Sequence, residues 1–270
     1  MMQTLSEYVI TSRLTHCNKC SANNSGICLD CKLTHPDRDC DIHQGVQMVK
    51  AECPRLLWDK EYSIVWVYHN VGLNGLEYSI NSVKKFLPHH NMFVCGDHTH
   101  LAETINTPRT RNSIYAKWHD SLTKLQRIID HTGVTDDFLW MYDDTFFLAP
   151  NTIRNVAQPK YSTSPPENKG SLWYCQLMHT LSLTESKYNY STHYPVVYNK
   201  HLLQHVLDTY KPPYLVETLY LNLYGKHPIA MDNSFQFSRD CVNWKLKPET
   251  TVLNVKRFTP TVQAALTEIL

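Results

Sequence analysis

Residues 137–148, with the sequence DFLWMYDDTFFL, constrain the fold more than any other part of the chain. A run of mostly apolar and aromatic residues leads directly into Asp143 and Asp144, and a second apolar run follows at once. The composition of the first run predicts a strand that is buried on both faces. Because a buried carboxylate is costly unless it is compensated, two of them at the end of such a strand need an explanation.

Two explanations are open for this acidic pair. Mg²⁺ and Mn²⁺ prefer carboxylate oxygens and also bind the oxygens of a diphosphate, so Asp143 and Asp144 could hold a divalent cation. Alternatively, the two residues form a turn and cap the segment that follows. The apolar residues on both sides favour the metal site, since exposed turns rarely interrupt such a run.

The neighbouring segments alternate between strand and helix patterns. A β-branched and aromatic run predicts a strand over residues 62–68, and apolar residues at three- and four-residue spacing predict a helix over 74–86. A second strand over 92–95, a polar loop and a long helix containing residues 118–129 precede the strand over 137–142. This alternation predicts an α/β domain with a mostly parallel sheet that is flanked by helices.

Ligands of such sheets bind beyond the carboxyl ends of the strands. We therefore expect the loop over 69–73, Asp97 and the acidic pair to meet at one edge. Arg109, Arg111, Lys117 and Lys124 are candidate ligands for a diphosphate, because cationic side chains, and guanidinium groups above all, bind its oxygens. The alternative for each basic residue is a place on a solvated helix face.

The first 60 residues are of a different kind, with six of the nine cysteines of the chain. The first four form a C-x2-C-x7-C-x2-C pattern: Cys17, Cys20, Cys28 and Cys31. This spacing predicts a structural Zn²⁺ site, with an iron–sulfur cluster or free or paired thiols as alternatives. Further ligands could come from Cys40, Cys53, His16, His35 and His43. We expect a zinc-binding module over 1–60, whose stability depends on the metal, and a second domain over 61–270.

The net charge and the apolar content of the sequence limit the kinds of partner that the chain can bind. The net charge of +1 excludes a strongly basic nucleic-acid coat but allows a local basic cleft. The sequence contains no apolar run of about 18 residues and no pattern of a secretion signal at its start. We therefore expect no membrane partner and a cytoplasmic location.

Two sequence blocks, GLEYSINSVKKFLPHHNMFVCGD and FLWMYDDTFFL, resemble those of GT-A nucleotide-sugar glycosyltransferases. In that family an acidic motif at a strand end holds Mn²⁺ or Mg²⁺ against the diphosphate of the donor. The resemblance implies a GT-A-like, Rossmann-like fold with a nucleotide-sugar half over 61–150 and an acceptor half over 151–270. It also implies that Tyr142, Asp143 and Asp144 contact the metal and a donor such as a UDP-sugar, with Asp144 as the direct metal ligand.

The chain is also similar to the Stealth group of sugar-phosphate transferases over about residues 62–205, and more weakly near Asn254. This similarity makes His193, in the segment THYP, a candidate third metal ligand or base. Stealth proteins carry acidic residues after their first Trp-Val, whereas residues 66–70 here read WVYHN. Glycosyl transfer is therefore favoured over sugar-phosphate transfer. A non-catalytic, zinc-containing nucleic-acid-binding protein is the third alternative.

The acceptor half contains a candidate base. Asp232 follows an apolar stretch and could deprotonate an acceptor hydroxyl if partial burial raises its pKa, or it could cap a turn.

The acceptor half also points to a candidate acceptor. By analogy with bacteriophage glycosyltransferases, and because a cysteine-rich module can hold nucleic acid, we expect the hydroxymethyl group of a modified pyrimidine in DNA. The location is then the cytoplasm of a viral host. Basic residues could contact phosphates or could belong to a solvated tail, namely Arg239, Lys245, Lys247, Lys256 and Arg257. Aromatic residues could stack on a flipped base, with a place in the core as the alternative for most of them, namely Trp173, Tyr174, Tyr194 and Trp244.

Overall fold

The computed structural model describes eight stretches of the chain: residues 62–69, 75–87, 91–107, 116–150, 156–163, 170–225, 227–238 and 245–270. All of them lie within Glu61–Leu270, the second of two units into which the chain divides. The first unit, Met1–Lys60, holds all four predicted zinc ligands and lies outside the described residues. Arg109, Arg111, Arg239 and Trp244 also lie outside them.

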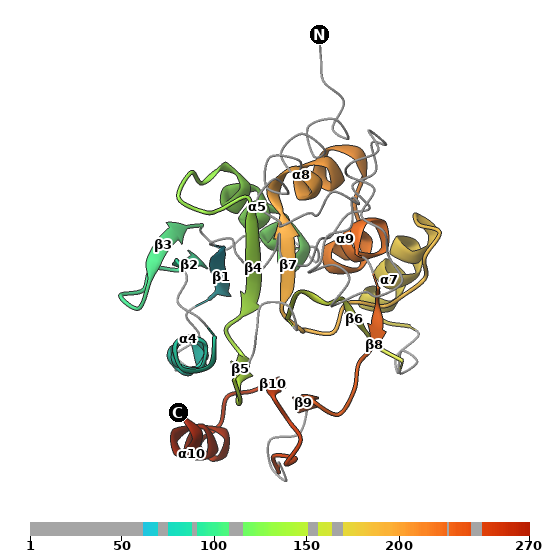
Figure 1. The fold of residues 1–270 in the computed structure, drawn as a ribbon. Helices are drawn as coiled ribbons and strands as arrows, with labels where there is room; N and C mark the ends of the chain where they lie inside the picture. The colour runs from blue at the N-terminus through green and yellow to red at the C-terminus, as the bar shows by residue number, and fades with distance from the viewer. Residues whose placement is uncertain are drawn as a thin grey trace, which may run out of the picture. The chain divides into compact units, whose positions relative to one another are not determined.

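A five-stranded sheet with the strand order β3-β2-β1-β4-β7 forms the centre of the second unit (Figure 1). Strands β1 (Ser63–Tyr68), β2 (Met92–Gly96), β3 (Glu103–Asn106) and β4 (Asp137–Tyr142) run parallel to one another. Strand β7 (Val196–Asn199) pairs with β4 in the antiparallel sense. The predicted α/β class with a mostly parallel sheet is therefore confirmed.

The polar loop predicted after β2 is wrong, because it contains β3. Only Ile105 of this edge strand is buried, whereas Glu103 and Asn106 are exposed. An edge strand with one apolar residue facing the core leaves almost no hydrophobic pattern in the sequence. The β3 pairing also depends on Gly96, which has φ +142° and whose Cβ, if present, would lie 1.9 Å from the carbonyl oxygen of Tyr68.

The two helices whose bounds the sequence predicts, α4 (Gly75–Phe86) and α5 (Ala116–Asp130), begin and end close to the predicted positions. Helix α4 connects β1 to β2, and α5 precedes β4. Helix α8 (Lys200–Thr209) follows β7 directly, and Asn199 caps it by accepting hydrogen bonds from the backbone of the first turn. The remaining helices are α7 (Leu172–Ser182), α9 (Val216–Tyr224) and α10 (Pro260–Ile269). No helix among the described residues is long and apolar enough to cross a bilayer.

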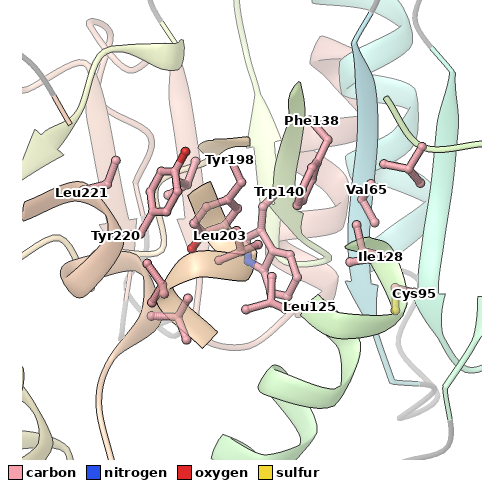
Figure 2. Close-up of a cluster of buried hydrophobic side chains, with 14 of the residues drawn as sticks. Val65, Cys95, Leu125, Ile128, Phe138, Trp140, Tyr198, Leu203, Tyr220 and Leu221 are labelled. Carbon is pink, nitrogen blue, oxygen red and sulfur yellow. The ribbon is translucent and has the colours of Figure 1, made fainter. Parts of the chain in front are cut away.

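The main core lies between one face of the large sheet and the helices α5, α8 and α9. Trp140 of β4 packs edge-on against Tyr198 of β7, with ring centroids 6.2 Å apart. Figure 2 shows these rings beside Leu125 and Ile128 of α5 and Leu203 of α8. Because all five side chains are almost fully buried, this cluster fixes β4 and β7 against the helices and gives the sheet edge a rigid base.

A small three-stranded sheet continues from the end of β4. Its central strand β10 (Val252–Val255) pairs antiparallel with β5 (Thr145–Phe147) and parallel with β9 (Phe235–Ser238). A separate parallel pair is formed by β6 (Lys160–Tyr161) and β8 (Ile229–Ala230). Figure 1 shows β10 beside β5. Since only two residues separate β4 from β5, this pairing brings β10 close to the acidic pair.

Candidate functional site

Asp143 and Asp144 form the turn between β4 and β5, at the carboxyl edge of the parallel sheet. The turn predicted as one of the two alternatives is thus confirmed for the backbone. Both residues are half-buried. The first residue of α4 packs against this turn, since a Cβ on Gly75 would lie 3.1 Å from the carbonyl oxygen of Asp143. The position therefore agrees with a site at the end of a strand.

Buried hydroxyl groups of α4 hold the backbone around this turn. Ser79 Oγ accepts a hydrogen bond of 2.8 Å from Trp66 Nε1 and donates one of 2.5 Å to the carbonyl oxygen of Thr145. One turn later, Ser82 Oγ accepts a hydrogen bond of 3.1 Å from the backbone N–H of Phe147. Because these contacts join β1, α4 and β5, the turn has little freedom to move.

Asn254 of β10 holds the side chain of Asp144. Its Nδ2 donates to Asp144 Oδ1 and to Thr145 Oγ1, both at 2.7 Å. The backbone N–H of Val255 donates to the carbonyl oxygen of Asp144 at 3.0 Å. Asn254 is fully buried, and its Oδ1 has no hydrogen-bond partner among the described residues. The orientation of Asp144 is therefore set by a residue from the small sheet.

Both carboxyl groups of the acidic pair are harder to ionise than usual. Burial and the nearby charge of Asp144 raise the pKa of Asp143 to about 7. Burial also raises the pKa of Asp144, although His193 and the hydrogen bond from Asn254 oppose the rise. Two adjacent carboxylates with raised pKa values form a site that a bound cation would stabilise.

His193 reaches this edge because β7 is antiparallel to its neighbour. Because β7 runs opposite to β4, the beginning of β7 lies beside the end of β4. The segment before Val196 therefore lies next to the residues that follow β4. The His193 ring lies 4.8 Å from that of Tyr142 and 5.9 Å from that of Phe237, measured between centroids. His193 has φ 58°, a backbone conformation that is uncommon for residues other than glycine and often occurs at functional sites.

A second polar cluster lies at the ends of β1 and β2. Lys124 of α5 is fully buried, with its Nζ 3.1 Å from Asp120 Oδ2 and 2.6 Å from His69 Nε2. His69 Nε2 also lies 2.7 Å from Asp120 Oδ2, and His69 Nδ1 lies 3.9 Å from Asp97 Oδ2. Depending on its tautomer, Nε2 accepts from Lys124 or donates to Asp120.

Charges couple the two clusters. Burial lowers the pKa of Lys124 although Asp120 opposes this, and the Lys124 charge in turn favours ionisation of Asp143. Burial, Asp143 and Asp97 together raise the pKa of Tyr68, the last residue of β1. The electrostatic contacts of Tyr68 thus place Asp97 and the acidic pair at one edge of the sheet, as the sequence predicts.

Two predicted site residues have other roles in the structure. The Tyr142 hydroxyl donates to Glu217 Oε1, so it points to α9 and is not free to contact a nucleotide. Asp232 is exposed and accepts hydrogen bonds from the backbone N–H (2.9 Å) and the hydroxyl of Ser234. Because the hydroxyl bond lowers the pKa of Asp232, the expected rise is wrong and the turn-capping alternative is confirmed.

The structure describes some of the aromatic residues considered for base stacking, but not the side chain of Lys117, a candidate diphosphate ligand. Tyr194, a candidate for stacking on a base, is buried with its ring edge-on to Phe235, so the alternative of a core position holds for this residue. Trp173 is half-buried and donates to Ser191 Oγ at 3.2 Å. The side chain of Lys117 lies outside the described part of α5.

Sequence reasoning missed several members of the site, and only some of them left a signal. Asp120 was missed, although it lies four residues before the candidate Lys124 on a helix, a spacing that brings opposite charges together. The sequence signal for Asn254 was only the weak similarity near the end of the chain. Phe237 left no signal, because its place at the site results from the pairing of β9 with β10.

The donor set fits a divalent cation that a ligand helps to hold. Among the described residues, no three His, Cys, Asp or Glu side chains gather closely enough to bind a metal by themselves. His193 as a third metal ligand therefore has no support in this geometry. The two carboxylates of Asp143 and Asp144 supply oxygen ligands, and their raised pKa values show that their charge is not compensated by the protein.

No protein-family model and no curated protein matches the chain. Among solved structures, it is similar to the apo-form glycosyltransferase GlyE of Streptococcus pneumoniae TIGR4, with 7% identity and a TM-score of 0.38 over 72% of this chain. The chain spans 54% of the length of GlyE. It is also similar to the galactosyltransferase LgtC in complex with donor and acceptor sugar analogues, with 11% identity and a TM-score of 0.43 over 77% of this chain and 95% of LgtC. Similarity at this level does not establish a shared activity.

Proposed function

We propose that residues 61–270 form a metal-dependent glycosyltransferase that takes its sugar from a nucleotide-sugar donor. The observation that carries this proposal is the acidic pair: two half-buried carboxylates at the carboxyl edge of a parallel sheet, with the pKa of Asp143 raised to about 7. Such an edge is where α/β sheets bind nucleotides, and uncompensated carboxylates there favour a divalent cation and its diphosphate ligand.

Asp143 and Asp144 would hold Mn²⁺ or Mg²⁺, which when bound stabilises the negative charge of the leaving diphosphate. Asn254 keeps the carboxylate of Asp144 in one orientation through its 2.7 Å hydrogen bond. The buried Lys124, beside Asp120 and His69 at the neighbouring strand ends, favours ionisation of Asp143. Asn254 and Lys124 thus position and tune the acidic pair, which would hold the donor through the metal before transfer begins.

For the acceptor we propose the hydroxymethyl group of a modified pyrimidine in DNA. Exposed basic residues near the small sheet support a polyanionic acceptor: Lys245, Lys247, Lys256 and Arg257. Sugar-phosphate transfer is the second candidate for the reaction. The end of β1 argues against it, since the position after Tyr68 holds His69, bonded to Asp120, in place of an acidic residue. For residues 1–60 we propose a structural Zn²⁺ site, supported by the cysteine spacing alone.

A thermal-shift panel of nucleoside diphosphates and sugar nucleotides, with and without Mn²⁺, tests donor binding in the full-length protein. We expect stabilisation that requires both nucleotide and metal. Asp144→Ala should abolish this shift and reduce sugar transfer more than about 100-fold, which is about 2.7 kcal/mol of transition-state stabilisation. Asp136→Ala, which changes an exposed carboxylate just before the opposite end of β4, is the matched control and should change transfer less than twofold.

The released nucleotide separates the two candidate reactions. Glycosyl transfer releases a nucleoside diphosphate, whereas sugar-phosphate transfer releases a monophosphate. If Asp144→Ala keeps more than about a tenth of wild-type turnover, a barrier change below about 1.4 kcal/mol, the metal role of this residue is wrong.

A further inference from the structure

One transverse row of the small sheet connects the acidic pair to the surface. Asn254 of β10 lies opposite Thr145 of β5 on one side and opposite Phe237 of β9 on the other. Residues directly opposite each other in a sheet project from the same face. Since Asn254 donates to both Asp144 and Thr145, this is the face next to the acidic pair, and Phe237 shares it.

Phe237 is an exposed aromatic ring that the site supports from within. Its side chain is 38% exposed, and its ring stacks on His193 with an interplanar angle of 26°. His193 packs against Tyr142, whose ring lies 6.2 Å from that of buried Trp140. The four rings thus form a continuous series from the core to the surface, and it passes beside the acidic turn. A ring held in this way can accept a stacked ligand with little loss of side-chain entropy.

Exposed cations lie on the segments next to β9 and β10. The side chain of Gln236, next to Phe237, bonds to the backbone of Lys245 and Lys247 at 3.0 and 3.1 Å, which holds the segment with these residues beside β9. Lys256 and Arg257 follow β10 directly. All four cations are exposed, and over residues 232–257 the sequence has five basic residues against three acidic ones, Asp232, Asp240 and Glu249. The surroundings of the ring therefore favour a negatively charged ligand.

We propose that Phe237 is the platform on which the acceptor ring stacks, and that the acceptor is a nucleic-acid strand whose base lies on Phe237 and whose phosphates contact the exposed cations. This inference rests on the proposed function, because it places the acceptor beside the donor site. An aromatic face can stack on either a sugar or a base, but the four cations select a polyanion over a neutral glycan. Every base can stack on an aromatic ring, so Phe237 would fix the position of the base without selecting its identity. Selection of the hydroxymethyl group would then come from the donor site beside the acidic pair.

Binding measurements on the full-length protein test the platform without any need for turnover. The probe is a labelled single-stranded 12-mer with one hydroxymethyluracil. The control strand has the same sequence with an abasic site at that position. Phe237→Ala should weaken binding of the hydroxymethyluracil strand at least tenfold, and Phe237→Trp should restore it. The same Phe237→Ala change should affect the abasic strand less than twofold, because that strand has no base to stack.

Tyr188→Ala is the matched control, since this ring is also 38% exposed and its ring contacts are with Tyr161 and Tyr190. It should bind both strands as the wild type does. Replacing Lys245 and Lys247 by Ala should weaken both strands equally and reduce the slope of affinity against salt.

Donor binding separates a failure of the platform from a failure of the proposed function. Suppose that UDP and Mn²⁺ stabilise the wild type, but that Phe237→Ala lowers the affinity equally for both strands or leaves it unchanged. The platform is then wrong and glycosyl transfer stands. If no nucleotide diphosphate stabilises the protein yet only the strand with a base depends on Phe237, the platform stands and the proposed function fails. A neutral maltoheptaose that displaces the strand and depends on Phe237 would overturn the nucleic-acid acceptor.

Discussion

Replacement of Asp143 by asparagine should stabilise the metal-free protein at alkaline pH while it removes a proposed metal ligand. The pKa of Asp143 is about 7 in the folded protein, against 3.8 for an unperturbed aspartate. Between these two values the folded state holds a proton that the unfolded state has lost. The free energy of unfolding therefore falls as the pH rises, by about 1.4 kcal/mol per pH unit at the steepest.

The structure gives the size of this effect. A rise from 3.8 to about 7 corresponds to about 4 kcal/mol of lost stability once the pH exceeds 7. Asparagine has nearly the same shape and carries no charge, so the variant should avoid this loss. We expect Asp143→Asn to unfold with a free energy about 2–4 kcal/mol above that of the wild type at pH 8, and with little difference at pH 4.

Urea unfolding followed by tryptophan fluorescence, in buffer without divalent cations, measures this difference at several pH values. For Asp136→Asn, at an exposed carboxylate, the free energy of unfolding should depend on pH as it does for the wild type. Added Mn²⁺ should stabilise the wild type more at pH 8 than at pH 5.5, because the metal binds ionised carboxylates. If Asp143→Asn is less stable than the wild type at pH 8, or shows the same dependence on pH, the reasoning about an uncompensated acidic pair is refuted.

Two further predictions concern Asn254 and the cysteine-rich segment. Asn254→Ala removes two buried hydrogen bonds of 2.7 Å, one of them to a carboxylate, so urea unfolding should show a loss of about 2–4 kcal/mol and Mn²⁺ should bind more weakly. Asn222→Ala is the control: it removes two hydrogen bonds to backbone carbonyls and one from the backbone N–H of Tyr188, and it should leave Mn²⁺ binding unchanged. Metal analysis should find about one Zn²⁺ per chain, and Cys17→Ser should lower solubility more than intrinsic turnover. A folded, active protein that contains neither zinc nor iron would rule out the zinc site.

The sequence predicts the elements that have strong local patterns. Strand β4 has the predicted bounds, and β1, α4 and β2 differ from the predicted bounds by a single residue at one end, since each has a buried, periodic apolar pattern. Among the strands that the sequence missed, β3 has one buried residue and lies at the sheet edge, whereas β10 is fully buried but only four residues long. Local patterning therefore gave the central layers of the fold and failed for short strands, whose pattern is too brief to recognise.

The strand pattern alone placed only those site residues that follow a strand, whereas His193 was a candidate through a family similarity. The acidic pair and Asp97 come directly after parallel strands, so the rule for α/β sheets placed them correctly. His193 precedes its strand, and its place at this edge depends on the antiparallel direction of β7, which no local pattern encodes. Asn254 lies 110 residues from Asp144 in the sequence, so their contact could be found only in the folded chain.

The central position of β10 in the small sheet has a consequence for how the protein folds. The pairs that β10 makes with β5 close a loop of more than 100 residues, whereas β1, β2 and β4 meet through much shorter connections. Closing a long loop costs chain entropy before any contacts form to offset it, so we expect β10 to dock late. An intermediate with a complete five-stranded sheet would then hold Asp144 without its partner Asn254. Competence to bind the metal would arise in the last step of folding, after most of the core has formed.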